Sequence, residues 1–335
     1  MRTLEELAIG LHALEAVDIS DFQRRARILQ ALWRVDQGYD CGEHRHKGVA
    51  RPLGSRLPMP WAQERLANFL SENIRSVVRN EVLDPRRSQG KLFSKPRIFD
   101  DLLSSQPLCF NLFAEFRFDL PSASQLVRGL TQGRFHEVVA VAFEHSPSRS
   151  DPKYSADRSA FDVFLECKTA SGGRGFLGVE VKYHENMLGK AADHRGRYDE
   201  IAKMMGCFGP DPGDLRKRSP MQQIWRDHML CGIVRATDGY DDALFVILYP
   251  AANDHCGRAI QSYKALLTNT DSFAAWTLEE VLGRLLADGP RGWAQQVFER
   301  YCDFPRIERA LAVRATAEQA VIGGPDPLLC SGSGR

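Results

Sequence analysis

The 335-residue sequence lacks a long hydrophobic run and an export signal. The most apolar stretch, at 244–252, is interrupted by Pro250, whereas a membrane-spanning helix needs roughly 20 apolar residues. The amino-terminal segment contains Glu5 and Glu6 and has no basic start leading into an unbroken apolar segment. We therefore expect a cytoplasmic protein with no membrane association.

The sequence also lacks an excess of charge of either sign. The chain has 44 Lys and Arg residues against 43 Asp and Glu residues, a net charge of +1, and 43% of its residues are hydrophobic. This balance excludes global disorder and a strongly basic, histone-like binder. It leaves nucleic acid open as a partner, because local basic clusters can exist within a neutral total.

The sequence contains no CxxC pair, nucleophile elbow or Walker loop. Its eight cysteines are scattered, which indicates neither a disulfide framework nor an iron–sulfur site. The segment 173–178 matches GxGxxG, but it leaves a predicted hairpin turn and enters a strand, so we interpret its glycines as turn residues and expect no nucleotide cofactor. Cys41, His44 and His46 lack a well-spaced second ligand pair, which favours a solvent-facing loop over a zinc site.

The hydrophobic pattern predicts an α/β protein with helical additions at both ends. Helices are expected within 3–35, over 61–82, 106–117 and 123–133, and then at 193–208, 219–234, 258–268 and 277–312; strands are expected at 138–144, 161–167, 176–183 and 244–249. Residues 36–60 and 83–107 look irregular. Three strands joined closely, and a fourth reached through helices and parallel to one of them, predict a mixed sheet with helices on both faces.

The hairpin formed by the second and third strands carries the candidate chemistry. Residues two apart in a strand share a face, so Glu180 and Lys182 point the same way, while Val179 and Val181 point the other way. The hairpin brings Asp162 beside them. Asp162, Glu180 and the Val181 carbonyl match the oxygen ligands that Mg²⁺ takes, and Lys182 is placed to hold a water or stabilise phosphate charge.

The pattern, Asp162 followed eighteen residues later by Glu180-Val181-Lys182, resembles the PD-(D/E)xK nuclease superfamily. Phe161 stands where the family usually has proline. The resemblance extends over about residues 60–300, with matching stretches at 102–116, 141–149, 159–167, 172–183, 222–230 and 245–253 of a restriction-endonuclease-like group. It implies a three-layer αβα restriction-endonuclease-like core.

The resemblance also implies roles for single residues. Asp162 and Glu180 would be metal ligands and Lys182 the catalytic lysine, while Glu115 and Glu144 would be further acidic contributors. Gln223 and Arg226 would lie near the scissile phosphate.

Each of these residues also has a simpler interpretation. Asp162, Glu180 and Lys182 are equally typical of a solvated strand face with a cross-strand ion pair. Glu115 fits an exposed helix position, and Gln223 and Arg226 fit the wet face of a helix. The apolar character of 176–183 and the order of elements favour the nuclease site over the surface strand.

Basic residues gather between 75 and 97. The segment has only two acidic residues, Glu81 and Asp84, against seven basic ones: Arg75, Arg79, Arg86, Arg87, Lys91, Lys95 and Arg97. Such a cluster is either a solvated helix end and loop or an arm that contacts nucleic-acid phosphates, and Arg216-Lys217-Arg218 extends the second interpretation. We expect at least one of the two clusters to contact DNA.

The sequence thus predicts a metal-dependent DNA endonuclease that uses Mg²⁺, with Mn²⁺ as a substitute, on duplex DNA, and that forms a homodimer if it cuts both strands symmetrically. An exonuclease or structure-specific nuclease on the same fold, and an idle DNA-binding protein, are the alternatives. The expected organisation is amino-terminal helices and loop in 1–60, the nuclease core with its basic arm in 61–270, helices in 271–312 and a flexible tail in 313–335.

Overall fold

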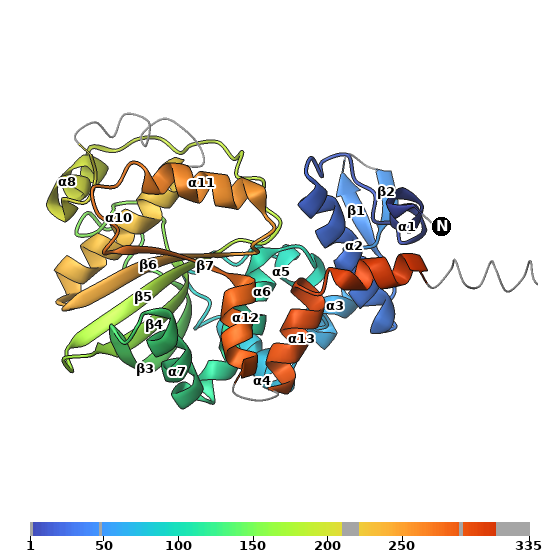
Figure 1. The fold of residues 1–335 in the computed structure, drawn as a ribbon, viewed down its shortest axis with the longest axis horizontal. Helices are drawn as coiled ribbons and strands as arrows, with labels where there is room; N and C mark the ends of the chain where they lie inside the picture. Colours follow the sequence, from blue (N-terminus) through green and yellow to red (C-terminus); the bar gives the residue numbers. More distant parts are fainter. Residues whose placement is uncertain (1–2, 47–48, 210–220, 288–290, 313–335) are drawn as a thin grey trace, which may run out of the picture.

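A five-stranded mixed sheet forms the centre of the molecule. The structure, a computed structural model, describes residues 3–46, 49–209, 221–287 and 291–312. The strand order is β3-β4-β5-β6-β7 (Figure 1). The strands are β3 (Phe135–His145), β4 (Phe161–Thr169), β5 (Arg174–Val181), β6 (Asp242–Tyr249) and β7 (Phe273–Thr277). β3, β4 and β5 are antiparallel neighbours, whereas β6 runs parallel to β5 and β7 parallel to β6, which confirms the mixed sheet.

Helices cover both faces of this sheet, so the predicted three-layer αβα core is confirmed (Figure 1). Alternating strand residues divide between two cores: Val179 and Val181 enter one, and Phe176 and Phe245 enter the other. The first core is covered by α6 (Ser105–Phe113), α7 (Leu120–Leu130), α12 (Leu278–Ala287) and α13 (Gly292–Tyr301). The second is covered by α8 (Gly196–Met205), α10 (Met221–Asp238) and α11 (Asp254–Lys264).

The amino-terminal part contains two helices and a β-hairpin. The helices are α1 (Leu4–Gly10) and α2 (Asp21–Asp36), and Ser20 and Gln23 form a capping box at the start of α2. The strands β1 (Gly42–His46) and β2 (Val49–Leu53) pair within the segment expected to be a loop. That expectation was wrong because two five-residue strands rich in Gly, Pro and charge carry almost no alternating hydrophobic signal.

The single helix predicted over 61–82 is also wrong. The chain forms α3 (Trp61–Arg65), turns at Leu66 with a left-handed φ of 50°, and resumes as α4 (Glu72–Val78) and a π-helical turn, η1 (Arg79–Leu83). Ser71 caps α4 by accepting a hydrogen bond from the Ile74 N–H at 3.1 Å. The buried Asn68 side chain donates to the carbonyl oxygens of Ile98 and Asp101 across the break, so tertiary hydrogen bonds override the local helical pattern.

Two further short elements complete the core, α5 (Arg97–Asp100) and η2 (Ala114–Arg117). The last strand, β7, is an addition to the four predicted, and its five residues lie just before the predicted carboxy-terminal helices. Residues 216–218 and the predicted tail lie outside the described residues.

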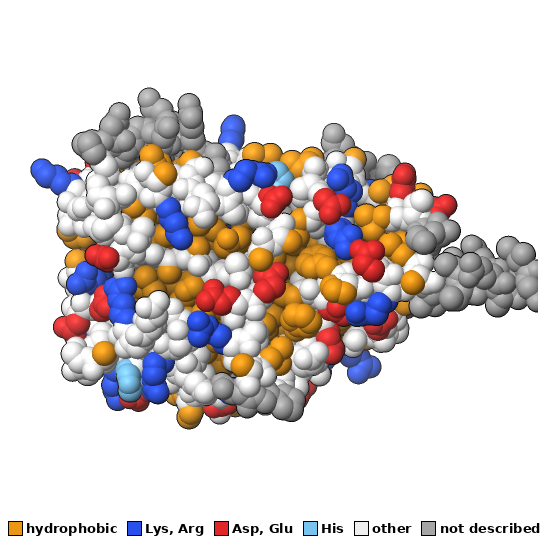
Figure 2. Space-filling view, viewed as in Figure 1, with side chains coloured by type: hydrophobic (Ala, Val, Ile, Leu, Met, Phe, Trp, Pro, Cys, Tyr) orange, Lys and Arg blue, Asp and Glu red, His pale blue; other side chains and the backbone are white. Residues whose placement is uncertain are grey.

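The surface carries charges of both signs. On the face drawn in Figure 2, Lys and Arg side chains lie among Asp and Glu side chains. No helix in the described part of the chain combines the length and apolar character needed to cross a membrane.

Candidate active site

The candidate site lies at the end of the sheet where β3 and β5 finish and β4 begins. Pairing of Val163 with Val179 brings Asp162 of β4 next to Glu180 of β5. Val179 and Val181 are fully buried in the core below, so Glu180 and Lys182 point to the opposite face, on the side of α10. The alternation predicted from the sequence is therefore present in the structure.

A cavity of about 290 Å³ opens at this point. Five of the predicted residues line it together: Glu144, Asp162, Glu180, Gln223 and Arg226. The rest of its wall comes from Ser159, Ala160, Gly189, Lys190, Ala191, Ala192, Gln222 and Asp227. Segments far apart in the sequence thus meet around one polar space.

Asp162 is half-buried and lines the cavity. Its Oδ2 accepts a hydrogen bond from the Val181 N–H at 2.8 Å. Burial, and then the neighbouring Glu180 carboxylate, raise the pKa of Asp162 well above its ordinary value, although Lys182 and the Val181 N–H act in the opposite direction. An ionised Asp162 therefore needs additional positive charge beside it.

Glu180 is held by two neighbours through the same oxygen. Its Oε1 accepts hydrogen bonds from Lys182 Nζ at 2.7 Å and from Gln223 Nε2 at 3.2 Å. No contact found in the described residues uses Glu180 Oε2 or Asp162 Oδ1. One oxygen of each carboxylate is consequently left for a ligand.

Lys182 is a buried cation among acids, with 8% of its surface exposed. Burial alone would lower its pKa, but Glu180, Glu185 and Asp162 outweigh burial and raise the pKa above the ordinary value. The lysine is therefore charged at neutral pH. Lys182 does not itself line the cavity, but its Nζ bonds Glu180, which does.

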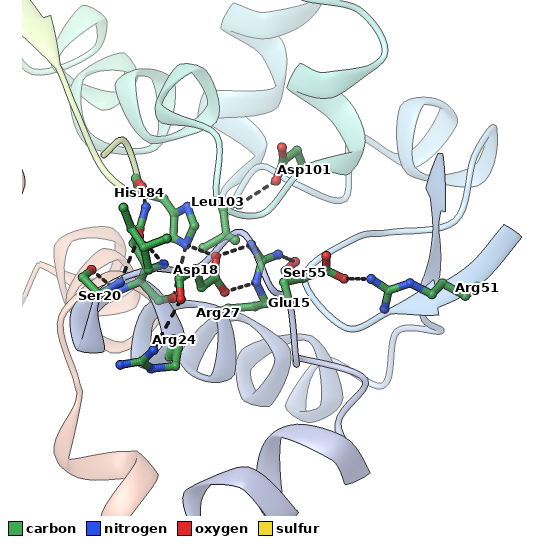
Figure 3. A network of polar contacts seen from close by, with 12 residues as sticks. Glu15, Asp18, Ser20, Arg24, Arg27, Arg51, Ser55, Asp101, Leu103 and His184 are labelled. Carbon is green, nitrogen blue, oxygen red and sulfur yellow. Dashed lines mark hydrogen bonds and ion pairs between the residues drawn. The ribbon is translucent and has the colours of Figure 1, made fainter. Parts of the chain in front are cut away.

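The residues that follow Lys182 are fixed from several sides. His184 is bound to α2, where its carbonyl accepts from Gln23 Nε2 at 3.0 Å and its ring lies 3.2 Å from Asp18 (Figure 3). The Asn253 side chain donates to the carbonyl of Tyr183 at 2.9 Å. The end of β5 is thereby anchored to both the amino-terminal helices and the start of α11.

Glu144, the penultimate residue of β3, has an unusual backbone conformation, a φ of 48°. Its Oε1 accepts from Arg149 at 2.6 Å, and both side chains are mostly buried. Glu144 lines the cavity as expected, but this ion pair already satisfies part of its charge.

Arg226 is oriented by the loop that precedes Asp162. Its Nε donates to Asp157 at 3.1 Å and its Nη2 to the hydroxyl of Ser159 at 3.0 Å. Asp157 also accepts from Ser155, from the Ser159 N–H and from the Tyr198 hydroxyl. The hydrogen bonds around Asp157 were not predicted, because Ser155, Asp157 and Ser159 lie in a loop without a regular sequence pattern.

The structure does not bring Glu115 to the cavity. It lies on η2, where its oxygens accept hydrogen bonds from the Ser71 hydroxyl and, at 2.9 Å, from Asn73 Nδ2. Glu115 thus braces the start of α4, and the role of metal ligand implied by the resemblance does not fit this placement.

Asp227 is a cavity residue that the sequence analysis did not identify. It follows Gln223 by one helical turn, and only 7% of its surface is exposed. The spacing Gln223 to Asp227 was a usable signal, since residues four apart share a helix face.

The donor set suits a hard divalent cation. Four carboxylates line the cavity, those of Glu144, Asp162, Glu180 and Asp227, and oxygen is the ligand that Mg²⁺ prefers. Within the described ranges no three His, Cys, Asp or Glu side chains cluster as a metal site, so any ion here would use one or two carboxylates. Asp162, Glu180 and the Val181 carbonyl meet that requirement, and Mg²⁺ normally completes its shell with water and phosphate oxygens.

Most basic residues of the segment 75–97 form ion pairs, with Glu81 inside the segment or with Glu72 and Asp101 beside it. Glu81 forms ion pairs with Arg117 and Lys91, and Glu72 forms an ion pair with Arg79 at 2.6 Å. Burial would raise the pKa of Glu81, but the contacts with Lys91 and Arg117 outweigh it and lower the pKa. Much of this cluster therefore stabilises the α4–η1 region.

The glycine motif at 173–178 lies in the β4–β5 turn and in β5, as predicted, and opens no helix. The Cys41, His44 and His46 group forms no metal cluster in the part of the chain that is described.

The family model described as the PD-(D/E)XK nuclease superfamily matches residues 17–303. No curated protein and no solved structure matches the chain significantly.

Proposed function

The chain belongs to the PD-(D/E)XK nuclease superfamily, and on that premise we propose that it is a Mg²⁺-dependent DNA endonuclease. The single observation that carries the proposal is the meeting of Asp162, Glu180 and Lys182 at one end of the sheet, beside a polar cavity. Superfamily membership indicates nuclease activity. From this we infer that the cation is Mg²⁺, that the substrate is duplex DNA and that cleavage is internal.

Asp162 Oδ1, Glu180 Oε2 and the carbonyl of Val181 would hold the cation, Mg²⁺ or its substitute Mn²⁺. The cation, when bound, supplies Lewis acidity toward the phosphate and lowers the pKa of a bound water. Lys182 would supply positive charge to the site through Glu180, whose Oε1 its Nζ contacts. Gln223 would hold Glu180 in place through its hydrogen bond, and Arg226, held by Asp157, lines the cavity and would contact a phosphate.

Glu144 is a further candidate contributor, through the oxygen that Arg149 leaves free. We also propose that the protein acts in the cytoplasm, and as a homodimer if both strands are cut symmetrically. Arg86 and Arg87 are exposed, and they are the candidates from the basic segment for phosphate contact.

The test uses supercoiled and linear plasmid, each incubated with Mg²⁺ or EDTA. The native protein is compared with Lys182→Ala and with Lys153→Ala, which removes an exposed lysine outside the cavity. Nicking or linearisation of the closed plasmid by the native protein and by Lys153→Ala, lost with EDTA and with Lys182→Ala, is the expected result.

Loss of linear DNA alone would replace the endonuclease with an exonuclease. Binding of both plasmids without cleavage, across a panel of different plasmid sequences, would instead support the idle DNA-binding protein.

A further inference from the structure

Lys190 is a cationic residue of the active-site cavity that has no partner among the described residues. Two cationic side chains from the described part of the chain line this cavity, those of Lys190 and Arg226. The Arg226 guanidinium is held by Asp157 and Ser159. Lys190 is exposed, and no hydrogen bond or ion pair joins it to the residues that the structure describes. Its ammonium group is therefore available to a charged group that enters the cavity.

The segment that carries Lys190 is fixed on both sides of it. Met187, three residues earlier, packs in the second core with 7% of its surface exposed. Two residues after Lys190, the Ala192 N–H donates to Gln222 Oε1 at 2.9 Å, and Gln222 Nε2 donates back to the Ala192 carbonyl at 2.5 Å. Gln222 belongs to α10 and is fully buried. The backbone of Lys190 is thus held beside the cavity, so that binding has to order little more than its side chain.

The charges around Lys190 define the ligand that it would bind. Four carboxylates line the same cavity: Glu144, Asp162, Glu180 and Asp227. Glu180 and Glu144 form ion pairs with other cations, Lys182 and Arg149. A divalent cation on Asp162 and Glu180 would neutralise much of this acidic wall. An anion with several oxygens, such as a phosphodiester, would then be attracted both by that cation and by the Lys190 ammonium.

We propose that Lys190 binds a backbone phosphate of the nucleic-acid substrate at the active-site cavity. This inference rests on the proposed function and deepens it, because it names a side chain that holds the substrate backbone beside Asp162 and Glu180. A phosphate contact carries no sequence information and strengthens binding to every sequence alike. It also releases a counter-ion from the nucleic acid, so the loss of the contact changes the salt dependence of binding.

The experiment measures binding of a fluorescent DNA duplex to the full chain by anisotropy, in Ca²⁺ and over a series of salt concentrations. Ca²⁺ takes oxygen ligands, as Mg²⁺ does, and it is used to neutralise the cavity acids. Native protein is compared with Lys190→Ala, Lys190→Arg and Lys203→Ala. Lys203 is the matched control, because it is an exposed lysine of α8, lies outside the cavity and forms no ion pair with the described residues. Thermal unfolding verifies that each variant is folded.

We expect Lys190→Ala to lower the affinity for the duplex by about fivefold to tenfold near about 0.1 M salt. The slope of log affinity against log salt concentration should become shallower by about 0.9, the value for one lost phosphate contact on duplex DNA. Lys190→Arg should keep the native slope because it keeps the charge, and Lys203→Ala should match the native protein.

A native slope and affinity in Lys190→Ala would overturn the proposal and leave the proposed function intact, and so would an equal loss of slope in Lys203→Ala. Tighter Mn²⁺ binding by Lys190→Ala with an unchanged slope would mean that Lys190 only balances the four carboxylates, which also overturns the proposal. Failure of the native protein to bind the duplex at any salt concentration, and to cleave it in Mg²⁺, would instead count against the proposed function itself.

Discussion

Lys182 is the only side-chain cation that bonds Glu180 in the described residues, and its charge acts on two half-buried carboxylates, those of Glu180 and Asp162. Replacing it with methionine keeps the length of the side chain and removes its charge. We expect Lys182→Met to lower the cleavage rate by about 10²–10³-fold, the usual cost of losing one preorganised electrostatic group. We also expect it to bind Mn²⁺ about tenfold more tightly, because a cation then replaces the missing charge.

The two effects are measured separately, by single-turnover cleavage and by Mn²⁺ titration. Weaker Mn²⁺ binding in Lys182→Met would mean that the lysine organises Glu180 rather than competing with the ion for its charge. Lys153→Ala serves again as the control for loss of an exposed lysine.

Asp18 illustrates how a single buried ion pair sets a pH dependence. Its carboxylate accepts two hydrogen bonds from Arg27, at 2.5 and 2.7 Å, and both side chains are buried (Figure 3). Burial would raise the pKa of Asp18, but the contacts with Arg27 and His184 outweigh it, so the folded-state pKa lies below the ordinary 3.8. Its stabilisation is therefore present above pH 3.8 and is lost as the pH falls through the lower, folded-state pKa.

We expect Asp18→Asn to lower the free energy of unfolding at neutral pH by about 3 kcal/mol, since it leaves Arg27 buried without its counter-ion. The difference from the native protein should shrink in acid, near or below the folded-state pKa. Urea unfolding at a series of pH values measures this, and a difference independent of pH would contradict it. Asp238→Asn, which disturbs no buried guanidinium pair, is the control.

At the scale of the element, Glu115 joins η2 to the beginning of α4. Its hydrogen bonds to Ser71 and Asn73 hold the residues that cap and begin that helix. We expect Glu115→Ala to lower stability by about 1.5–3 kcal/mol, the usual net contribution of hydrogen bonds to a charged group, while cleavage per folded molecule changes by less than about twofold.

Thermal unfolding and metal-dependent cleavage of Glu115→Ala are compared with those of Glu144→Gln, which changes an acid that does line the cavity. A large loss of cleavage in Glu115→Ala with unchanged stability would restore the role implied by family resemblance.

The elements that the sequence predicted well are those whose pattern repeats over many residues. The strands 161–167 and 176–183 and the helix at 219–234 fall within β4, β5 and α10 to within a few residues. Asp162, Glu180 and Lys182 could be placed because strand alternation and hairpin pairing are local rules.

The rest depended on contacts between distant segments. The break at Leu66 is stabilised by Asn68, whose partners lie some thirty residues away in the sequence. β7 pairs with β6, so its strand character depends on a segment more than twenty residues earlier in the sequence. The roles of Glu115 and Asp227 likewise depend on tertiary neighbours that the sequence does not reveal. Glu115 contacts Ser71 and Asn73, whereas Asp227 lines the cavity.

At the scale of the whole molecule, the amino-terminal helices are joined to the nuclease core through buried contacts. Phe22 of α2 meets the ring of Tyr183, directly after Lys182, with ring centres 6.1 Å apart. Gln30 donates to the carbonyl of Arg300 at 2.9 Å and accepts from the Arg300 side chain at 3.1 Å. Helix α2 therefore packs on both β5 and α13, and the sequence boundary expected at residue 60 does not coincide with a gap between cores.

We expect the chain to unfold in one cooperative transition and a fragment beginning at residue 41 to fail to fold. Removing α2 would expose Tyr183 and leave the buried Arg300 without the Gln30 carbonyl oxygen that it contacts. It would also free His184, two residues from Lys182, from Gln23 and Asp18. Tyr183 and Arg300 are fully buried, and unsatisfied buried polar groups cost about 1–3 kcal/mol apiece against a total stability of about 5–15 kcal/mol.

Calorimetry of the full chain provides the measurement, because equality of the calorimetric and van't Hoff enthalpies identifies a single cooperative unit. The fragment starting at residue 41 is compared with one starting at residue 3, which keeps α1 and α2. Two transitions in the full chain, or a fragment from residue 41 that unfolds cooperatively and still cleaves plasmid, would show that the amino-terminal helices are an accessory. In that case the anchoring of β5 would have to come from Asn253 and the start of α11 alone.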